Sequence, residues 1–337
     1  MTEVAAPTSS VVANWRQVLR TGNPPEGRLD PVSRWLVLTR AAVLPMTLTA
    51  GLVAGLLAVG DDGFRPALLV LAVVGIALAH MSNNLMNDLA DADVGSDTAS
   101  YPRALYAPHP ILSGMITRKG LAAAALFVNL LDLAIMLVLF TQRGWPVVAF
   151  AVAGFALSFA YTAPPLRLKK RGLGELDVLL VWGPLMVGGT YYAAVGHLPW
   201  EIVVASIPYA LLCTTVLMGK HIDKAPWDEP QGIKTLPVLL GEAASRRVTQ
   251  AMMASFYATV VVAVAIGALP WPSLLALGAL PALRKVWQAF GRPRPERPPR
   301  NFPVWPLWFA PIAFLHTRRA GALLVLGLAV AAVFRIR

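Results

Sequence analysis

The chain has little charge and almost no cysteine. Of its 337 residues only 14% are charged, 56% are hydrophobic, and Cys213 is the single cysteine. Soluble domains carry about 25% charged residues, so this composition excludes an ordinary soluble protein. One cysteine excludes a disulfide framework and a cysteine-based metal site. Residues 1–34 lack the apolar stretch of a cleaved signal peptide, so we expect no such peptide.

Long apolar runs take the place of the missing charge. A helix needs roughly 20 apolar residues to cross a hydrocarbon core of about 30 Å. We therefore predict an all-α membrane protein, a polytopic bundle of about nine transmembrane helices. The predicted spans are residues 35–59, 66–89, 121–141, 145–161, 176–195, 202–218, 248–269, 273–287 and 320–334.

Two segments are predicted to lie outside these spans. Residues 1–34 are expected to form a cytoplasmic N-terminal tail, ahead of one membrane domain over residues 35–337. Residues 302–316 are apolar but contain three prolines, and we expect an interfacial or re-entrant piece there. The alternative is a tenth span.

The basic residues are unevenly distributed among the connections. The chain has 29 Lys and Arg against 18 Asp and Glu, a net charge of +11. Alternate connections are rich in Lys and Arg, whereas those on the other side offer only Arg65 and Arg143. The positive-inside rule then predicts a cell-membrane protein whose N-terminus and basic loops are cytoplasmic. The charge reflects topology and contact with the lipid bilayer, and we expect no nucleic-acid partner.

A first acidic cluster ends the second predicted span. Asn84, Asn87, Asp88 and Asp91 have the i, i+3, i+4, i+7 spacing of one helical face. Like charges gathered at the edge of a bilayer are costly unless a cation neutralises them. Oxygen ligands without His or Cys favour Mg²⁺, with the amides also near a bound diphosphate. The alternative is a solvated acidic helix end.

A second acidic cluster follows the sixth predicted span, on the same side of the membrane. It contains Asp223 and Asp228 together with Lys220 and Lys224. Two facing Mg²⁺ sites with nearby lysines would clamp a diphosphate and stabilise charge on a leaving pyrophosphate. Taken alone, this stretch is equally well explained as an ordinary charged loop.

A basic loop follows the fourth predicted span. The Pro164-Pro165 corner directs the residues behind it, and Arg167 and Lys169 are the candidates for phosphate contact. Positive-inside anchoring is an alternative explanation for Lys170 and Arg171.

Together these three stretches resemble the UbiA superfamily of intramembrane prenyltransferases, from about Trp35 through the last span. The run from Asn87 to Asp97 is similar to the first motif of dihydroxynaphthoate-type members, which has Gly before its last Asp. The resemblance implies nine spans around a central cavity that opens near the cytoplasmic face. It also implies that Asn87, Asp88, Asp91 and Asp97 bind Mg²⁺ and diphosphate.

The second motif is matched less completely. Residues Gly232–Leu236 set its register, in which Asp228 matches the second aspartate and Lys224 stands where the first is expected. Asp223 is one residue too far away, and we predict that a local helical bulge brings it to the metal.

A third element of the family runs from a Tyr to a Lys, for which Tyr161 and Lys169 are the candidates. Tyr161 would stabilise a carbocation. The implied catalytic set is Asp88, Asp91, Asp228 and Lys169.

The resemblance implies Mg²⁺-dependent transfer of a polyprenyl group from a prenyl diphosphate to a hydrophobic, usually aromatic, quinone-precursor acceptor. His109–Gly114 departs from the commoner Arg-Pro-Leu form, which leaves the acceptor open. Asp132 and Asp177 lie within spans, and either could face the cavity or form a hydrogen bond to a neighbouring helix.

Two other functions remain possible at this level. A UbiA-type terpene cyclase would ionise the same substrate and let the prenyl chain attack its own cation. A cation transporter would need carboxylates near the membrane midplane, whereas both clusters stand at span ends.

Overall fold

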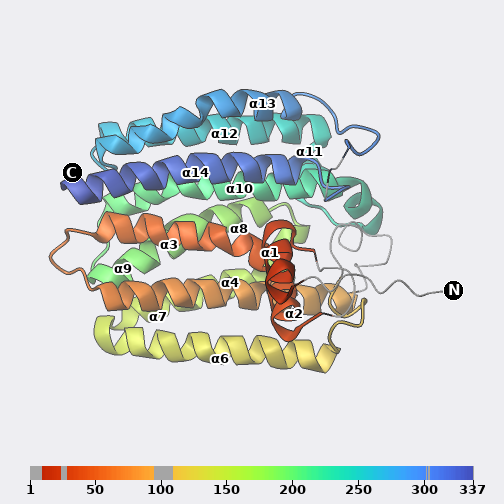
Figure 1. Cartoon of the computed structure of the whole chain (residues 1–337), viewed down its shortest axis with the longest axis horizontal. Helices are drawn as coiled ribbons and strands as arrows, with labels where there is room; N and C mark the ends of the chain where they lie inside the picture. Colours follow the sequence, from red (N-terminus) through yellow and green to blue (C-terminus); the bar gives the residue numbers. More distant parts are fainter. Residues whose placement is uncertain (1–9, 24–28, 95–108, 301, 303, 337) are drawn as a thin grey trace.

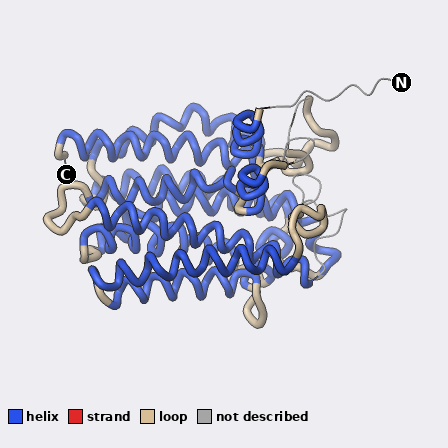
Figure 2. Tube along the Cα trace, turned by 60° about the horizontal axis from the view of Figure 1, so that its bottom comes forward, coloured by secondary structure: helices blue, strands red, loops and turns tan. Residues whose placement is uncertain are grey.

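The computed structural model describes residues 10–23, 29–94, 109–300, 302 and 304–336, and for residues 91–94 it describes the backbone alone. Throughout this part of the chain the regular structure is helical. The long helices lie side by side, with their loops gathered at the two ends of the bundle (Figure 1, Figure 2). The predicted all-α membrane fold is confirmed.

Eight helical rods in the described residues are long and apolar enough to cross a membrane. They are η1–α3 (Ala41–Val43, Leu44–Ala58), α4 (Pro66–Val94), α6 (Arg118–Arg143), α7 (Trp145–Thr162), α8–η3–α9 (Gly174–Leu180, Val181–Gly188, Gly189–Val195), α10 (Trp200–Asp228), α12 (Glu242–Ala265) and α14 (Phe309–Phe334). The predicted span 273–287 instead consists of a 3₁₀ segment, η5 (Trp271–Ala279), followed by α13 (Leu280–Phe290), and it packs against α12 and α14.

The first predicted span is broken near its start. Helix α2 (Pro31–Leu38) ends at Thr39, and Arg40 then takes a left-handed backbone conformation with φ of 53° before the membrane rod begins. Asp30 caps α2 by accepting the backbone N–H of Val32 and Ser33, and hydrogen bonds from Ser33 lower the pKa of Asp30 to about 2. Helices α1 (Val11–Thr21) and α2 pack together and run across the long helices (Figure 1).

The C-terminal prediction needs a correction. Residues 309–316 were expected to lie in an interfacial or re-entrant piece, but they form the first turns of α14, which runs on to Phe334. Proline is tolerated in the first turn of a helix, so Pro311 does not interrupt α14. Arg318 and Arg319 therefore lie on this helix, with exposed side chains, and not in a loop.

Close helix packing and a polar clamp hold the bundle together. A Cβ at Gly219 on α10 would lie 2.8 Å from the backbone of Phe309 on α14, so only glycine allows this approach. At the opposite end of the bundle, Arg143 donates to the carbonyls of Gly63 (2.9 Å), Ala193 (2.9 Å) and Ala194 (2.6 Å). This clamp ties α6 to two other segments at that end.

Candidate active site

A cavity of about 640 Å³ lies between the helices. Most of the α4 residues that line the cavity recur every three to four positions along the helix. One continuous face of α4 therefore forms this part of the wall. The α4 residues in the wall are Ala72, Gly75, Ile76, Ala79, His80, Ser82, Asn83, Asn84 and Asn87. Helices α6, α7 and α10 and the α8–η3–α9 rod supply most of the other walls.

The cavity differs in chemistry along its length. One end, called here the polar end, has Asn84, Asn87, Tyr161 and Lys220 in its wall. Farther along α4 and α7, the lining residues Ala72 and Val147 belong to a small hydrophobic cluster, together with Leu139 on α6 and Ala193 on α9. We call this cluster the floor. The cavity therefore fits a molecule with a polar head and a long apolar tail.

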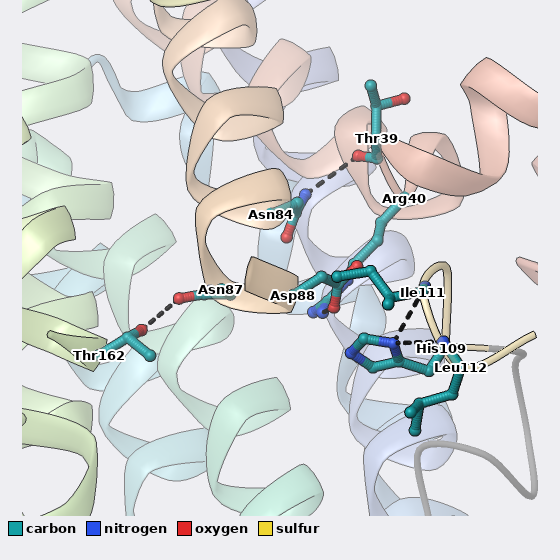
Figure 3. A network of polar contacts seen from close by, with 9 residues as sticks. All are labelled: Thr39, Arg40, Asn84, Asn87, Asp88, His109, Ile111, Leu112 and Thr162. Atoms are coloured by element: carbon teal, nitrogen blue, oxygen red, sulfur yellow. Dashed lines mark hydrogen bonds and ion pairs between the residues drawn. The ribbon is translucent and has the colours of Figure 1, made fainter. Parts of the chain in front are cut away.

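In the described part of the first acidic cluster, Asn84 and Asn87 line the polar end of the cavity, whereas Asp88 lies behind the wall and is paired with Arg40 (Figure 3). Asn84, Asn87 and Asp88 are buried, at 4%, 8% and 0% exposure. Asn84 donates to the carbonyl of Thr39 at 3.1 Å, and the Thr162 hydroxyl donates to Asn87. These contacts connect α4 to the end of α2 and the end of α7, so the cluster is held by three segments.

Arg40 is a site residue that the sequence analysis missed. Its guanidinium forms an ion pair with the buried carboxylate of Asp88. Left-handed backbone is costly for a residue with a side chain, and such strain is concentrated at functional sites. Arg167 shares this conformation, with φ of 45°. The available signal for Arg40 was a lone cation inside an apolar run.

The oxygen atoms available near the polar end are of the chemical type that Mg²⁺ binds. Asn87 and Asp88 offer amide and carboxylate oxygens, which Mg²⁺ prefers to nitrogen or sulfur ligands. The described residues contain no group of three or more His, Cys, Asp or Glu side chains placed to hold a metal. The predicted ligands Asp91 and Asp97 lie outside the described side chains. The described residues thus supply part of a ligand set.

The basic loop lies against the polar end. The Nζ atom of Lys169 lies 6.0 Å from the centre of the Tyr161 ring, and Tyr161 is 9% exposed. The Nε atom of Arg167 is buried and has no hydrogen-bond partner in the described structure. Arg171 and Lys234 form a backbone bridge, so the basic loop and the segment after α10 meet.

The second acidic cluster is helical where a loop was expected. Asp223 and Asp228 both lie on α10 and are buried. Both carboxylate oxygens of Asp223 are engaged at 2.9 Å, by the backbone N–H groups of Phe309 and Ala310 at the start of α14. No helical bulge toward a metal is described at Asp223, which caps α14 instead, and its role as a ligand stays a prediction.

The remaining predicted residues divide between the cavity and its surroundings. Lys220 lines the cavity, whereas Lys224, Asp223 and Asp228 are not part of the wall that the structure describes. His221 is paired with Glu175 at 2.7 Å, and both side chains are buried, which joins α10 to the start of α8.

Four further cavity residues lie deeper than the polar end. His80 and Trp182 pack edge to face, with ring centroids 5.4 Å apart. Asp132 and Asp177 both line the cavity, as the sequence allowed.

The His109 loop adjoins the first acidic cluster. His109 is buried, and its Nδ1 accepts the backbone N–H of Ile111 at 3.2 Å (Figure 3). Ile111 packs on the cluster of buried residues that includes Leu38 on α2 and Leu85 on α4. The loop His109–Gly114, whose sequence differs from the commoner form of the family, therefore lies close to the polar end of the cavity.

The known proteins that this chain resembles in sequence are all named as prenyltransferases. The profile of the UbiA prenyltransferase family matches residues 46–318. A 2-carboxy-1,4-naphthoquinone phytyltransferase from Synechocystis is 26% identical over 257 residues, 75% of this chain and 80% of that protein. A 1,4-dihydroxy-2-naphthoate octaprenyltransferase from Mycobacterium tuberculosis is 30% identical over 224 residues, 65% and 72% of the two chains. The Escherichia coli protein with the same activity is 28% identical over 236 residues, 66% and 73%.

Solved structures show the same fold. The apo structure of a UbiA homolog from Aeropyrum pernix has a TM-score of 0.61 at 18% identity, covering 85% of this chain and 96% of its own. A homolog from Archaeoglobus fulgidus bound to GPP and Mg²⁺ has a TM-score of 0.54 at 18% identity, covering 86% and 99%.

Proposed function

Because the chain belongs to the UbiA prenyltransferase family, we propose that this prenyltransferase moves a prenyl group from a prenyl diphosphate to a dihydroxynaphthoate-class acceptor. We further propose that the reaction depends on Mg²⁺ and takes place at the polar end of the cavity. That end would face the cytoplasm, as the positive-inside rule predicts. The names of the relatives support the acceptor class.

The observation that carries the proposal is the cavity itself. Amide oxygens and a lysine stand at one end, and the hydrophobic floor closes the other. A prenyl diphosphate has the same division between a charged head and an apolar tail. Its tail would gain by leaving water at roughly 25 cal/mol per Å² of apolar surface buried.

The charged head would be held from several segments. Asn87, Asp88 and Asp228 would hold Mg²⁺, with Asp91 and Asp97 completing the set. Bound Mg²⁺ supplies charge neutralisation for the diphosphate oxygens. Lys169, Arg167, Lys220 and Lys224 would contact the diphosphate directly. Arg40 holds Asp88 in place through their ion pair.

Ionisation would follow at the boundary between head and tail. The bond from the allylic carbon to oxygen breaks, and its electron pair leaves on the diphosphate, whose charge the basic residues stabilise. The allylic cation then lies beside Tyr161, whose ring can contribute about 0.5–2 kcal/mol of cation–π stabilisation. The surrounding apolar wall excludes water, which would otherwise give the alcohol. An electron-rich ring carbon of the acceptor forms the new bond to the allylic carbon, and the same ring carbon then loses its proton, which the released diphosphate can accept, so that the ring is aromatic again.

The test is turnover by purified protein in detergent or liposomes. We expect prenyl diphosphate and a dihydroxynaphthoate to be consumed together only when Mg²⁺ is present, and Asp88→Asn to lower kcat at least 100-fold. Asp62→Asn is the matched control, because Asp62 is exposed and follows α3 at the other end of the bundle. A cyclic product formed without acceptor would instead support a terpene cyclase. Absence of Mg²⁺-dependent diphosphate release would contradict the proposal.

A further inference from the structure

Asp177 is a buried carboxylate that the proposed chemistry has not yet used. It lies on α8, lines the cavity and is 5% exposed. Its Oδ1 atom is buried and accepts no hydrogen bond from any residue that the structure describes. Burying a polar oxygen without a partner costs free energy. A ligand in the cavity would remove that cost by donating a hydrogen bond.

The depth of Asp177 can be followed from contacts at the polar end. Thr162, next to Tyr161, donates to Asn87. A Cβ at Gly174, at the start of α8, would lie 3.2 Å from Cε2 of Tyr161. Asp177 is three residues further along α8, which is about 4.5 Å of helical rise. Asp177 is therefore one helical turn deeper than the level at which the diphosphate would bind.

Asp132 stands at a different level. A Cβ at Gly75 would lie 3.3 Å from Oδ1 of Asp132. Gly75 precedes Asn87 by twelve residues on the same helix, which is about 18 Å. Asp132 thus faces the region for the prenyl tail, far from the reacting carbon, whereas Asp177 stands beside it.

The chemistry of a carboxylate limits what it can bind. A carboxyl oxygen that carries no proton, as Oδ1 of Asp177 is described, only accepts hydrogen bonds. The diphosphate would be repelled, and the prenyl tail has no donor. Of the substrates in the proposed function, only the hydroxynaphthoate carries donors, on its ring hydroxyl groups.

We propose that Asp177 binds the acceptor by accepting a hydrogen bond from a ring hydroxyl at Oδ1. This inference rests on the proposed function, and it deepens it by assigning a residue to the acceptor. The bond orients the ring beside the allylic carbon. It also draws the hydroxyl proton toward the carboxylate, which makes the ring carbons more electron-rich where one of them attacks.

The experiment compares Asp177→Leu, Asp177→Asn and Asp132→Asn in steady-state kinetics with both substrates varied. For Asp177→Leu we expect KM for the acceptor to rise at least tenfold, while KM for the prenyl diphosphate changes less than twofold. Asp177→Asn should fall between Asp177→Leu and the wild type, because its amide oxygen can still accept. Asp132→Asn should leave the KM for the acceptor unchanged.

A second measurement separates binding from folding. The acceptor is replaced by analogues that each lack one ring hydroxyl. The wild type should discriminate at least tenfold against one analogue, and Asp177→Leu should discriminate less than twofold, because the partner of that hydroxyl is gone. Equal discrimination by both proteins, or an unchanged acceptor KM in Asp177→Leu, would overturn the inference.

The two proposals fail in different ways. If the wild-type protein releases diphosphate but never consumes a hydroxynaphthoate, the proposed acceptor class is wrong, and the assignment of Asp177 falls with it. If the wild type uses the acceptor and Asp177→Leu uses it equally well, only the inference about Asp177 is wrong.

Discussion

At the scale of single residues, the ion pair of Arg40 and Asp88 governs the polar end. Asp88 is fully buried, and its carboxylate is paired with a guanidinium from a different segment. A buried charge that loses its partner is expensive, so this pair must be intact or replaced by another cation. The same carboxylate is a proposed Mg²⁺ ligand, so Arg40 and the metal would share one partner.

Arg40→Ala should lower the free energy of unfolding by about 3–5 kcal/mol, because the buried carboxylate of Asp88 loses its ion pair with Arg40. Added Mg²⁺ should restore part of this loss, since the metal can take over the positive charge at Asp88. We would measure thermal unfolding in detergent with and without Mg²⁺.

Arg34→Ala is the control for this variant. Arg34 is exposed on the neighbouring helix α2, so its removal should change the stability by no more than about 0.5 kcal/mol. An equal response of Arg40→Ala and wild type to Mg²⁺ would contradict a metal at Asp88.

At the scale of elements, one contact explains why α14 starts where it does. Asp223 on α10 accepts the first free N–H groups of α14, at Phe309 and Ala310. The first four N–H groups of a helix have no partner within it, and a side-chain acceptor satisfies them. A residue eighty-six positions earlier thus sets the start of the last membrane helix.

Asp223→Ala should lower the free energy of unfolding by about 1–3 kcal/mol, because two buried N–H groups lose their acceptor. Asp223→Asn should lose less, since one oxygen remains. The measurement is the unfolding midpoint, together with the Mg²⁺ concentration that gives half-maximal diphosphate release.

The metal dependence distinguishes the two roles of Asp223. If Asp223 only caps α14, its variants should keep the wild-type half-maximal Mg²⁺ concentration in the fraction that folds. A several-fold rise in that concentration would show that Asp223 is also a ligand. Glu229→Ala, an exposed carboxylate just after α10, should change neither value.

At the scale of the whole molecule, the bundle has two chemically different ends. The polar end of the cavity has Asn87, Tyr161 and Lys220 in its wall, and the Arg143 clamp lies at the other end of the bundle. The positive-inside rule predicts that the polar end is cytoplasmic. The single cysteine makes this orientation easy to test, because Cys213 is 2% exposed.

We would place one new cysteine at each end, as Gln231→Cys and His197→Cys, both at exposed positions. A membrane-impermeant thiol reagent added to intact cells should label His197→Cys alone, because only that end faces outward. Gln231→Cys should react after the membrane is permeabilised, and the wild type should not react. Labelling of Gln231→Cys in intact cells would reverse the orientation.

The sequence by itself determined the membrane class, most of the spans and the helix that carries the first acidic cluster. Hydropathy reports directly on the cost of exposing backbone and charge to lipid, so long apolar runs predict helices whatever they pack against. The spacing of Asn84, Asn87 and Asp88 predicted one helical face, because that geometry is local. Nothing in this step required knowledge of the neighbouring helices.

Tertiary structure alone decided the partners of these groups. The break at Arg40, the capping of α14 by Asp223 and the unpartnered oxygen of Asp177 all depend on residues far apart in the chain. Such contacts have no sequence period, because they form only when separate helices meet and leave a buried polar group to be satisfied. For that reason charge and spacing could place the polar residues at one end of the bundle, but only the packed helices decided that Asn84, Asn87 and Lys220 line the cavity.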